Sequence, residues 1–266
     1  METIVFSNDG DAELLGDLYK PEGDGPHPVV IGLSGGGWRR GGRADLAPWG
    51  RYLAAAGIAF FSADYRRAVQ GPVYPHNVGD AAAALGFLAR EGRLLGLDPA
   101  RIGLLGVSAG AHLGALAVLS EAGRVAAPKV FIGVYGIYDL VAHWQADLWR
   151  NAAAGEDLTE RFIGCVPHQD QRRYFDASPI RQIDGAAKDV KFLLVWGERD
   201  GEVLPRQSEE FQRALTQAGA MARTIPVPDA GHFWFSEDPL DDPLGFTAAV
   251  APKLRRFLDR HLVMGR

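Results

Sequence analysis

Arg101-Ile-Gly-Leu-Leu-Gly-Val-Ser-Ala-Gly-Ala-His112 is the stretch of sequence that decides the fold of this chain. Its apolar first half leads into the pentapeptide Gly106-Val-Ser-Ala-Gly110, and small residues suited to a helix follow at once. A strand that turns sharply into a helix in this way lifts the serine at the turn above the sheet. Glycines two positions before and after Ser108 remove side chains that would clash in the turn. The pattern predicts that Ser108 is an accessible nucleophile.

The rest of the chain continues the alternation of strand and helix that this stretch begins. Continuous apolar runs, typical of strands covered on both faces, occur at 29–33, 58–63, 102–107, 130–135 and 192–196. A last strand is expected near 223–227. Helical patterns occur at 46–56, 77–95, 109–119 and 207–218. The alternation predicts an α/β fold with a mostly parallel central sheet wrapped by helices.

The amino-terminal segment has a different pattern. Residues 2–7 and 13–19 alternate apolar and polar side chains, and Asn8-Asp9-Gly10 between them is typical of a hairpin turn. We therefore expect two antiparallel strands at the edge of the sheet.

One long segment, about 139–183, interrupts the alternation and is too long for a simple connection. It is rich in aromatic residues, namely Trp144, Trp149, Phe162, Tyr174 and Phe175. Open α/β sheets bind ligands beyond the carboxyl ends of their strands. We therefore expect a cap insertion over the strand ends, within a single domain that spans 1–266. The alternative is that these aromatic residues only pack the insertion onto the main domain.

A serine nucleophile needs a base and a carboxylate that orients the base. His232 is the best candidate for the base, because it lies in a loop between the last strand pattern and the terminal helix. Asp200 is the best candidate for the acid, because it follows the strand pattern at 192–196 and precedes the histidine. Asp139 and Glu198 are the alternatives for the acid.

The remaining histidines have other expected places. His112 is expected to make a structural hydrogen bond on the helix after Ser108, and His27 is expected in a surface turn. Weaker candidates for the base are His76, His143 and His168, and the alternative for each is a place in the wall of the substrate pocket.

The segment Leu33-Ser-Gly-Gly-Gly-Trp38 is expected to supply the oxyanion site. Glycines leave backbone N–H groups open to a ligand, and this loop falls at the end of a predicted strand. We expect the N–H groups of Gly36, Gly37 and Ala109 to face the developing negative charge. The alternative is a flexible loop without a ligand.

These motifs together resemble the α/β-hydrolase superfamily, and within it the esterase and lipase group with an HGGGW-type oxyanion loop. That group includes hormone-sensitive-lipase-like esterases and acetyl or feruloyl esterases. The resemblance also includes Ser62-Ala-Asp-Tyr-Arg-Arg67, Gly96-Leu-Asp-Pro-Ala-Arg-Ile-Gly103 and Ala177-Ser-Pro-Ile180. The chain departs from the family motif at Ser34, which replaces its histidine. A serine hydrogen bond to nearby backbone is expected to preserve the glycine turn.

The resemblance implies a metal-independent serine hydrolase without a cofactor. We expect a carboxylesterase that cleaves small or medium esters through an acyl-enzyme. An amidase or formamidase, similar to kynurenine formamidases, is the alternative, and a non-catalytic ligand-binding protein is another. The expected walls of the substrate pocket are aromatic residues of strand-end loops and of the insertion: Trp38, Tyr65, Trp144, Trp149, Phe233 and Trp234.

Composition narrows the classes of partner and location. The 266-residue chain is 47% hydrophobic, which suffices for a large core. A net charge of −5 gives no basic face for nucleic acid, and no apolar run reaches the roughly 18 residues that cross a bilayer. The first residues lack the pattern of a signal peptide, so a cytoplasmic location is expected. The single cysteine, Cys165, allows no internal disulfide and is expected to be a small buried residue; composition predicts no oligomeric state.

Overall fold

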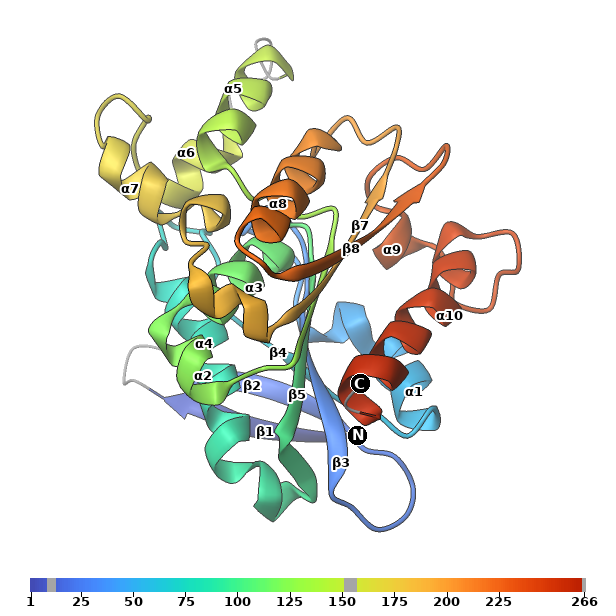
Figure 1. Ribbon diagram of the computed structural model, residues 1–266. Helices are drawn as coiled ribbons and strands as arrows, with labels where there is room; N and C mark the ends of the chain where they lie inside the picture. The colour runs from blue at the N-terminus through green and yellow to red at the C-terminus, as the bar shows by residue number, and fades with distance from the viewer. Residues whose placement is uncertain (9–12, 151–156, 265–266) are drawn as a thin grey trace.

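The computed structural model describes residues 1–8, 13–150 and 157–264. Its centre is an eight-stranded sheet with the strand order β1-β2-β4-β3-β5-β6-β7-β8 (Figure 1). The strands are β1 (Glu2–Asn8), β2 (Glu13–Tyr19), β3 (His27–Leu33), β4 (Ala59–Ala63), β5 (Leu97–Val107), β6 (Val130–Val134), β7 (Lys191–Gly197) and β8 (Met221–Val227). The mostly parallel sheet predicted from the sequence is confirmed.

The first two strands are antiparallel and the rest of the sheet is parallel, as the sequence predicts. β1 pairs with β2, and β2 with β4, in antiparallel fashion, while every other neighbouring pair is parallel. β4 and β6 are buried along their whole length, as continuous apolar strands inside a sheet must be. The edge strand β1 is mostly exposed. The predicted hairpin turn at Asn8-Asp9-Gly10 falls mainly outside the described residues.

β5 is longer than its apolar run. It begins at Leu97 rather than at Ile102, and Leu97 pairs with His27 of β3. Residues 98–101 are only half-buried or exposed, so they carry no apolar signal although they extend the strand. Hydrogen bonding to β3 therefore lengthens β5 beyond the part that the core specifies.

Helices cover both faces of the sheet. Figure 1 shows α1 and α10 on one side and α2, α3 and α4 on the other. Their bounds are α1 (Ala47–Ala55), α2 (His76–Glu91), α3 (Ala109–Leu119), α4 (Glu121–Ala126), α8 (Arg206–Gln217), α9 (Trp234–Glu237) and α10 (Phe246–Leu258). Within the described ranges, no helix has both the length and the apolar character that a bilayer crossing requires.

α3 is the central helix of the molecule. Every residue of α3 is buried, and its composition of alanine, glycine and leucine lets it pack closely against β5, β6 and α2. A helix held on all sides cannot shift easily, because interiors are close-packed. The turn at Ser108, directly before α3, is therefore attached to a rigid element.

The segment between β6 and β7 forms a separate group of short helices. They are α5 (Leu140–Arg150), α6 (Leu158–Ile163) and α7 (Gln171–Asp176), followed by 3₁₀ turns at Pro179–Arg181 and Gly185–Asp189. Figure 1 shows α5, α6 and α7 gathered beyond the sheet at the upper left. Residues 151–156 of the predicted insertion lie outside the described part of the chain. The predicted role of this group as a cap stays a prediction.

Candidate active site

Ser108 occupies a sharp turn between β5 and α3. Its backbone has φ 52° and ψ −118°, a left-handed value that residues with side chains rarely adopt. The surrounding glycines make this turn possible: a Cβ at Gly110 would sit against the carbonyl oxygen of Leu33, and one at Gly106 would lie 2.5 Å from the Cα of Ala111. The Ser108 N–H donates to the carbonyl of Val134 at 2.9 Å, which fixes the turn to the end of β6.

Two hydrogen bonds join Ser108, His232 and Asp200. The Ser108 Oγ lies 3.0 Å from His232 Nε2, and His232 Nδ1 lies 2.7 Å from Asp200 Oδ2. The side chain of His232 is 6% exposed and that of Asp200 is fully buried. An ionised carboxylate only accepts hydrogen bonds, so Nδ1 carries the proton and Nε2 is free to accept from the serine hydroxyl.

The carboxylate of Asp200 is held in one orientation. Its Oδ1 accepts from the N–H groups of Glu202 and Val203, each at 2.9 Å. Because both bonds use the same oxygen, Oδ2 is the atom left to face His232. The loop after β7 thus aims the acid at the base.

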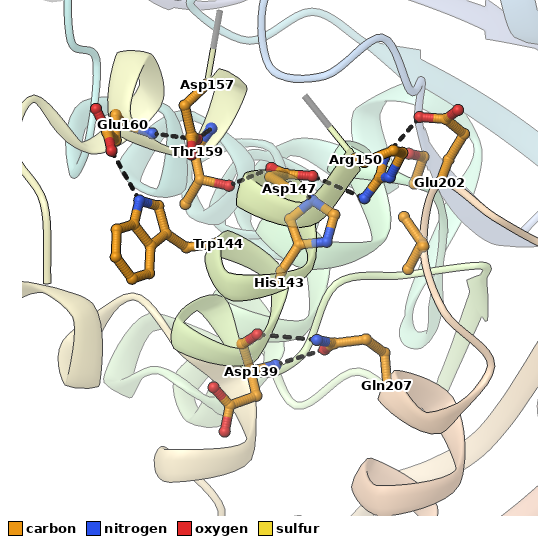
Figure 2. Close-up of polar contacts among 12 residues, drawn as sticks. Asp139, His143, Trp144, Asp147, Arg150, Asp157, Thr159, Glu160, Glu202 and Gln207 are labelled. Carbon is orange, nitrogen blue, oxygen red and sulfur yellow. Dashed lines mark hydrogen bonds and ion pairs between the residues drawn. The ribbon is translucent and has the colours of Figure 1, made fainter. Parts of the chain in front are cut away.

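The alternative acids lie elsewhere. Asp139 accepts from the N–H of Ala142 at 3.0 Å and pairs with Arg181 at 3.2 Å. Figure 2 shows its carboxylate pointing away from Gln207, which bonds only its backbone. The side chain of Glu198 is exposed. The described geometry therefore joins only Asp200 of these candidates to His232.

The ring of Tyr135 packs against the ring of His232, a contact that the sequence did not predict. Its ring centroid lies 4.3 Å from that of His232, and it is 1% exposed. Burial raises the pKa of its hydroxyl, which keeps the side chain neutral. A large aromatic residue at the carboxyl end of β6, one position beyond the strand, is the sequence signal that points to such a contact.

The glycine loop between β3 and α1 turns beside Ser108. Gly36 has φ 110° and Gly37 has φ 57°, values that favour glycine. The carbonyl of Gly36 accepts from the N–H groups of Arg39 and Arg40 at 3.1 and 2.9 Å. No hydrogen bond within the described residues uses the N–H of Gly36 or Gly37. Their expected role as oxyanion donors stays a prediction.

Ser34 anchors this loop in a way that differs from the expectation. The predicted partner of its hydroxyl was nearby backbone, but the hydroxyl accepts from Arg67 Nη2 at 2.9 Å. The hydroxyl of Tyr65 donates to the Ser34 carbonyl at 2.8 Å. Tyr65, expected as a pocket wall, is 3% exposed and thus lies mainly beneath the loop. The partner of the Ser34 hydroxyl is therefore the Arg67 side chain and not the nearby backbone.

A hydrogen bond between Trp38 and His112 fixes the carboxyl-terminal end of the segment 33–38 to α3. Trp38 is 1% exposed, stacks on Phe162 at 4.6 Å, and donates from its indole N–H to His112 Nδ1 at 3.1 Å. His112 Nε2 in turn lies 2.7 Å from the carbonyl of Ala177. Burial lowers the pKa of His112 to about 4, so the ring is neutral and can accept at one nitrogen while it donates at the other. The structural hydrogen bond expected of His112 is thus present.

The other expected wall residues have varied surroundings. Trp144 donates to Glu160 at 2.8 Å, and Trp149 is 89% exposed near the end of α5. Phe233 is 55% exposed, and its ring lies nearly perpendicular to that of His232 with 4.8 Å between the centroids. Trp234 is buried and packs against Tyr135. Among these four side chains, only Phe233 has a ring contact with His232 in the described part of the chain.

A polar network within the insertion reaches the loop that carries Asp200 (Figure 2). Asp147 is buried, accepts from Thr159 Oγ1 at 3.0 Å, and pairs with Arg150 at 2.8 Å. Arg150 also pairs with Glu202 at 2.8 Å. Burial raises the pKa of Asp147, against the effect of its charged partner. The network ties α5 and α6 together and links them to the acid loop.

Two further expectations concern Cys165 and metal binding. Cys165 is half-buried rather than buried, and burial raises the pKa of its thiol. Across the described ranges, no three His, Cys, Asp or Glu side chains gather as metal ligands would.

A family model and several named esterases match this chain. The BD-FAE family model matches residues 16–215, which is most of the chain. The chain is 31% identical over 244 residues to the isoprenylcysteine alpha-carbonyl methylesterase ICME of Arabidopsis thaliana, covering 84% of this chain and 55% of that protein. It is 30% identical over 246 residues to esterase LipC of Mycobacterium tuberculosis, covering 86% and 58%. The chain spans about half the length of the curated relatives it matches.

Solved structures share the fold. Carboxyl esterase 2 of the fungus Tuber melanosporum superposes with a TM-score of 0.76 at 27% identity, covering 94% of this chain and 82% of that one. Esterase 2 of Thermogutta terrifontis superposes with a TM-score of 0.77 at 22% identity, covering 97% and 91%. This chain belongs to the BD-FAE family and has the α/β-hydrolase fold of the esterases it resembles.

Proposed function

We propose that this chain is a serine carboxylesterase with Ser108 as nucleophile, His232 as base and Asp200 as the acid that orients it. The observation that carries the proposal is the pair of hydrogen bonds from Ser108 Oγ to His232 Nε2 at 3.0 Å and from His232 Nδ1 to Asp200 at 2.7 Å. The names of the relatives, which are esterases, support the same reaction.

In the proposed acylation, Ser108 Oγ attacks the ester carbonyl carbon and gives its proton to His232 Nε2. The carbonyl π electrons move to oxygen, and the N–H groups of Gly36, Gly37 and Ala109 stabilise that charge. When the carbonyl re-forms, the bond to the alcohol oxygen breaks and the imidazolium protonates the leaving alcohol. Asp200 stabilises the imidazolium throughout without taking its proton.

In the proposed deacylation, water takes the place of the alcohol. His232 Nε2 accepts a proton from the water, whose oxygen attacks the acyl carbon. A second oxyanion forms at the same donors, and the bond to Ser108 Oγ breaks as His232 returns the proton. The products are a carboxylic acid and the free serine.

The proposed substrates are small or medium carboxylic esters. Two apolar side chains beside the proposed site support this choice: the ring of Phe233 packs against His232, and Leu158 of α6 lies beside Gly37. The relative from Arabidopsis thaliana carries the name of a methylesterase, which suggests methyl esters as a first group to assay. The cytoplasmic location expected from the sequence stays a prediction.

Turnover of p-nitrophenyl acetate, butyrate and octanoate tests the proposal, together with labelling by a fluorophosphonate. Ser108→Ala should remove nearly all turnover and all labelling, while Ser7→Ala on the edge strand β1 should keep both. Labelling without ester turnover would favour an amidase, to be assayed with N-formylkynurenine. The absence of both would contradict the hydrolase and leave a ligand-binding protein.

A further inference from the structure

We propose that Arg67 is a positioning residue that holds the glycine loop in the shape needed to bind the oxyanion. The inference rests on the proposed function, because it assigns Arg67 a part in the same reaction. Arg67 does not contact Ser108, His232 or Asp200 in any described hydrogen bond, so it acts through the loop.

The guanidinium of Arg67 bonds two successive residues of the loop. Its Nη2 donates to Ser34 Oγ at 2.9 Å, and its Nη1 donates to the carbonyl of Gly35 at 3.3 Å. The planar fork of an arginine fixes two acceptors in direction as well as in distance. The loop is therefore held at a side chain and at the adjacent backbone.

Tyr65 holds Arg67 in turn. The Arg67 Cζ lies 3.4 Å from the centroid of the Tyr65 ring, and the Tyr65 hydroxyl donates to the Ser34 carbonyl at 2.8 Å. Stacking on a buried ring limits the rotamers of the arginine, so less entropy is lost when the fork binds. The segment after β4 therefore binds Ser34 twice: Arg67 donates to its hydroxyl, and Tyr65 donates to its carbonyl.

The bond to the Gly35 carbonyl sets the direction of the next N–H. In a trans peptide the C=O of one residue and the N–H of the following residue point to opposite sides. Holding the Gly35 carbonyl towards Arg67 therefore turns the Gly36 N–H away from Arg67. A Cβ at Gly35 would lie 3.3 Å from the Cβ of Ser108, so the loop backbone passes directly beside the nucleophile.

A glycine loop needs such an external grip. Glycine adopts many backbone conformations, and only the Gly36–Gly37 peptide is held from within the loop, by the N–H groups of Arg39 and Arg40, so the Gly35–Gly36 peptide depends on Arg67 among the described contacts. Ser34 is 1% exposed, and loss of its partner would leave a buried hydroxyl acceptor with no access to water. The neighbouring Arg66 cannot substitute, because it is bound to the carboxylate of Asp80 at 2.6 Å.

Steady-state kinetics with p-nitrophenyl butyrate test the inference. Arg67→Met keeps the length and the apolar stem but removes the fork. It should lower kcat about 10- to 100-fold with KM changed less than about threefold, because the lost interaction matters most when the oxyanion has formed. The inhibition constant of a trifluoromethyl ketone, which forms a hemiketal oxyanion, should rise by the same factor.

Two variants serve as comparisons. Arg67→Lys keeps the charge without the planar fork, and it should stay at least about tenfold below the wild type. Arg101→Met removes an arginine that bonds the Pro26 carbonyl at 2.8 Å before β3, at the opposite end of the strands, and it should leave kcat within about twofold. A kcat for Arg67→Met equal to that of Arg101→Met would overturn the inference.

A crystal structure of Arg67→Met separates this inference from the proposed function. The Gly35–Gly36 peptide should be rotated or present in two orientations, whether or not the protein hydrolyses esters. An unchanged peptide would overturn the positioning role even with an active wild type. A rotated peptide in a protein whose wild type neither turns over esters nor takes the fluorophosphonate would instead overturn the proposed function alone.

Discussion

Replacing Asp200 by asparagine tests the orientation of His232 with almost no change in shape. The N–H groups of Glu202 and Val203 both donate to Oδ1 of Asp200. An asparagine at this position must place its carbonyl oxygen at those donors, and its amide NH₂ then faces His232 Nδ1. The histidine can only respond by accepting at Nδ1 and carrying its proton on Nε2.

The size of the effect follows from that tautomer. A protonated Nε2 donates towards Ser108 Oγ, 3.0 Å away, and cannot take the serine proton. Loss of the correct tautomer in a serine triad lowers kcat about 10⁴-fold, which corresponds to about 5.5 kcal/mol. KM should change little, because Asp200 is buried below the histidine and does not touch substrate.

Turnover of p-nitrophenyl butyrate between pH 6 and 10 provides the assay, with circular dichroism to check the fold. Asp139→Asn is the matched control, since Asp139 pairs with Arg181 rather than with the histidine, and it should stay within about threefold of the wild type. The reasoning is refuted if Asp200→Asn keeps more than about a tenth of kcat, or if Asp139→Asn shows the larger loss.

Three further predictions concern stability. Burial lowers the pKa of His112 to about 4 and that of His143 to about 3, so the unfolded chain binds more protons below about pH 6.5. The free energy of unfolding should therefore fall as pH drops from about 6.5 to about 4, by up to about 1.4 kcal/mol per pH unit for each histidine. Urea unfolding curves measured across this pH range check the slope, and a free energy of unfolding that does not fall with pH would contradict the prediction. Gly110→Ala should destabilise by several kcal/mol, because its methyl group meets backbone, whereas Gly79→Ala in α2 meets open space and should be neutral or stabilising in thermal melts. Asp147→Leu should speed amide exchange in α5 and α6 more than in α3, because it leaves Arg150 and Thr159 without their buried acceptor; equal changes throughout would rule out a local anchor.

The sheet and most helices are predictable because their signals are local. The continuous apolar runs at 29–33 and 130–135 became β3 and β6, and the pattern at 109–119 matches α3 to the residue. The chain order of Ser108, Asp200 and His232 also follows from motifs at strand ends. The distances join these residues in the predicted order, while their catalytic roles stay predictions.

Side-chain partners across elements are less predictable. The Arg67 contact with Ser34 depends on β4 lying beside β3, so that the segment after one strand reaches the loop after the other. No periodicity in the sequence encodes that pairing. Tyr65 and Trp38 show the same limit, because an aromatic residue beside a site can line it or support it from beneath, and only packing distinguishes the two.

The path of the chain between β6 and β7 defines which parts of the protein an engineer can exchange. Ser108, Asp200 and His232 all lie outside this segment, in the turn after β5 and in the loops after β7 and β8. Contacts between this segment and the site set the limit. Tyr135 packs against His232, and Arg150 pairs with Glu202 of the acid loop. Phe162 of α6 stacks on Trp38, and the carbonyl of Ala177 lies at hydrogen-bond distance from His112. A library that varies α7 while it retains those anchors would therefore test the predicted cap role of this segment without changing Ser108, Asp200 or His232.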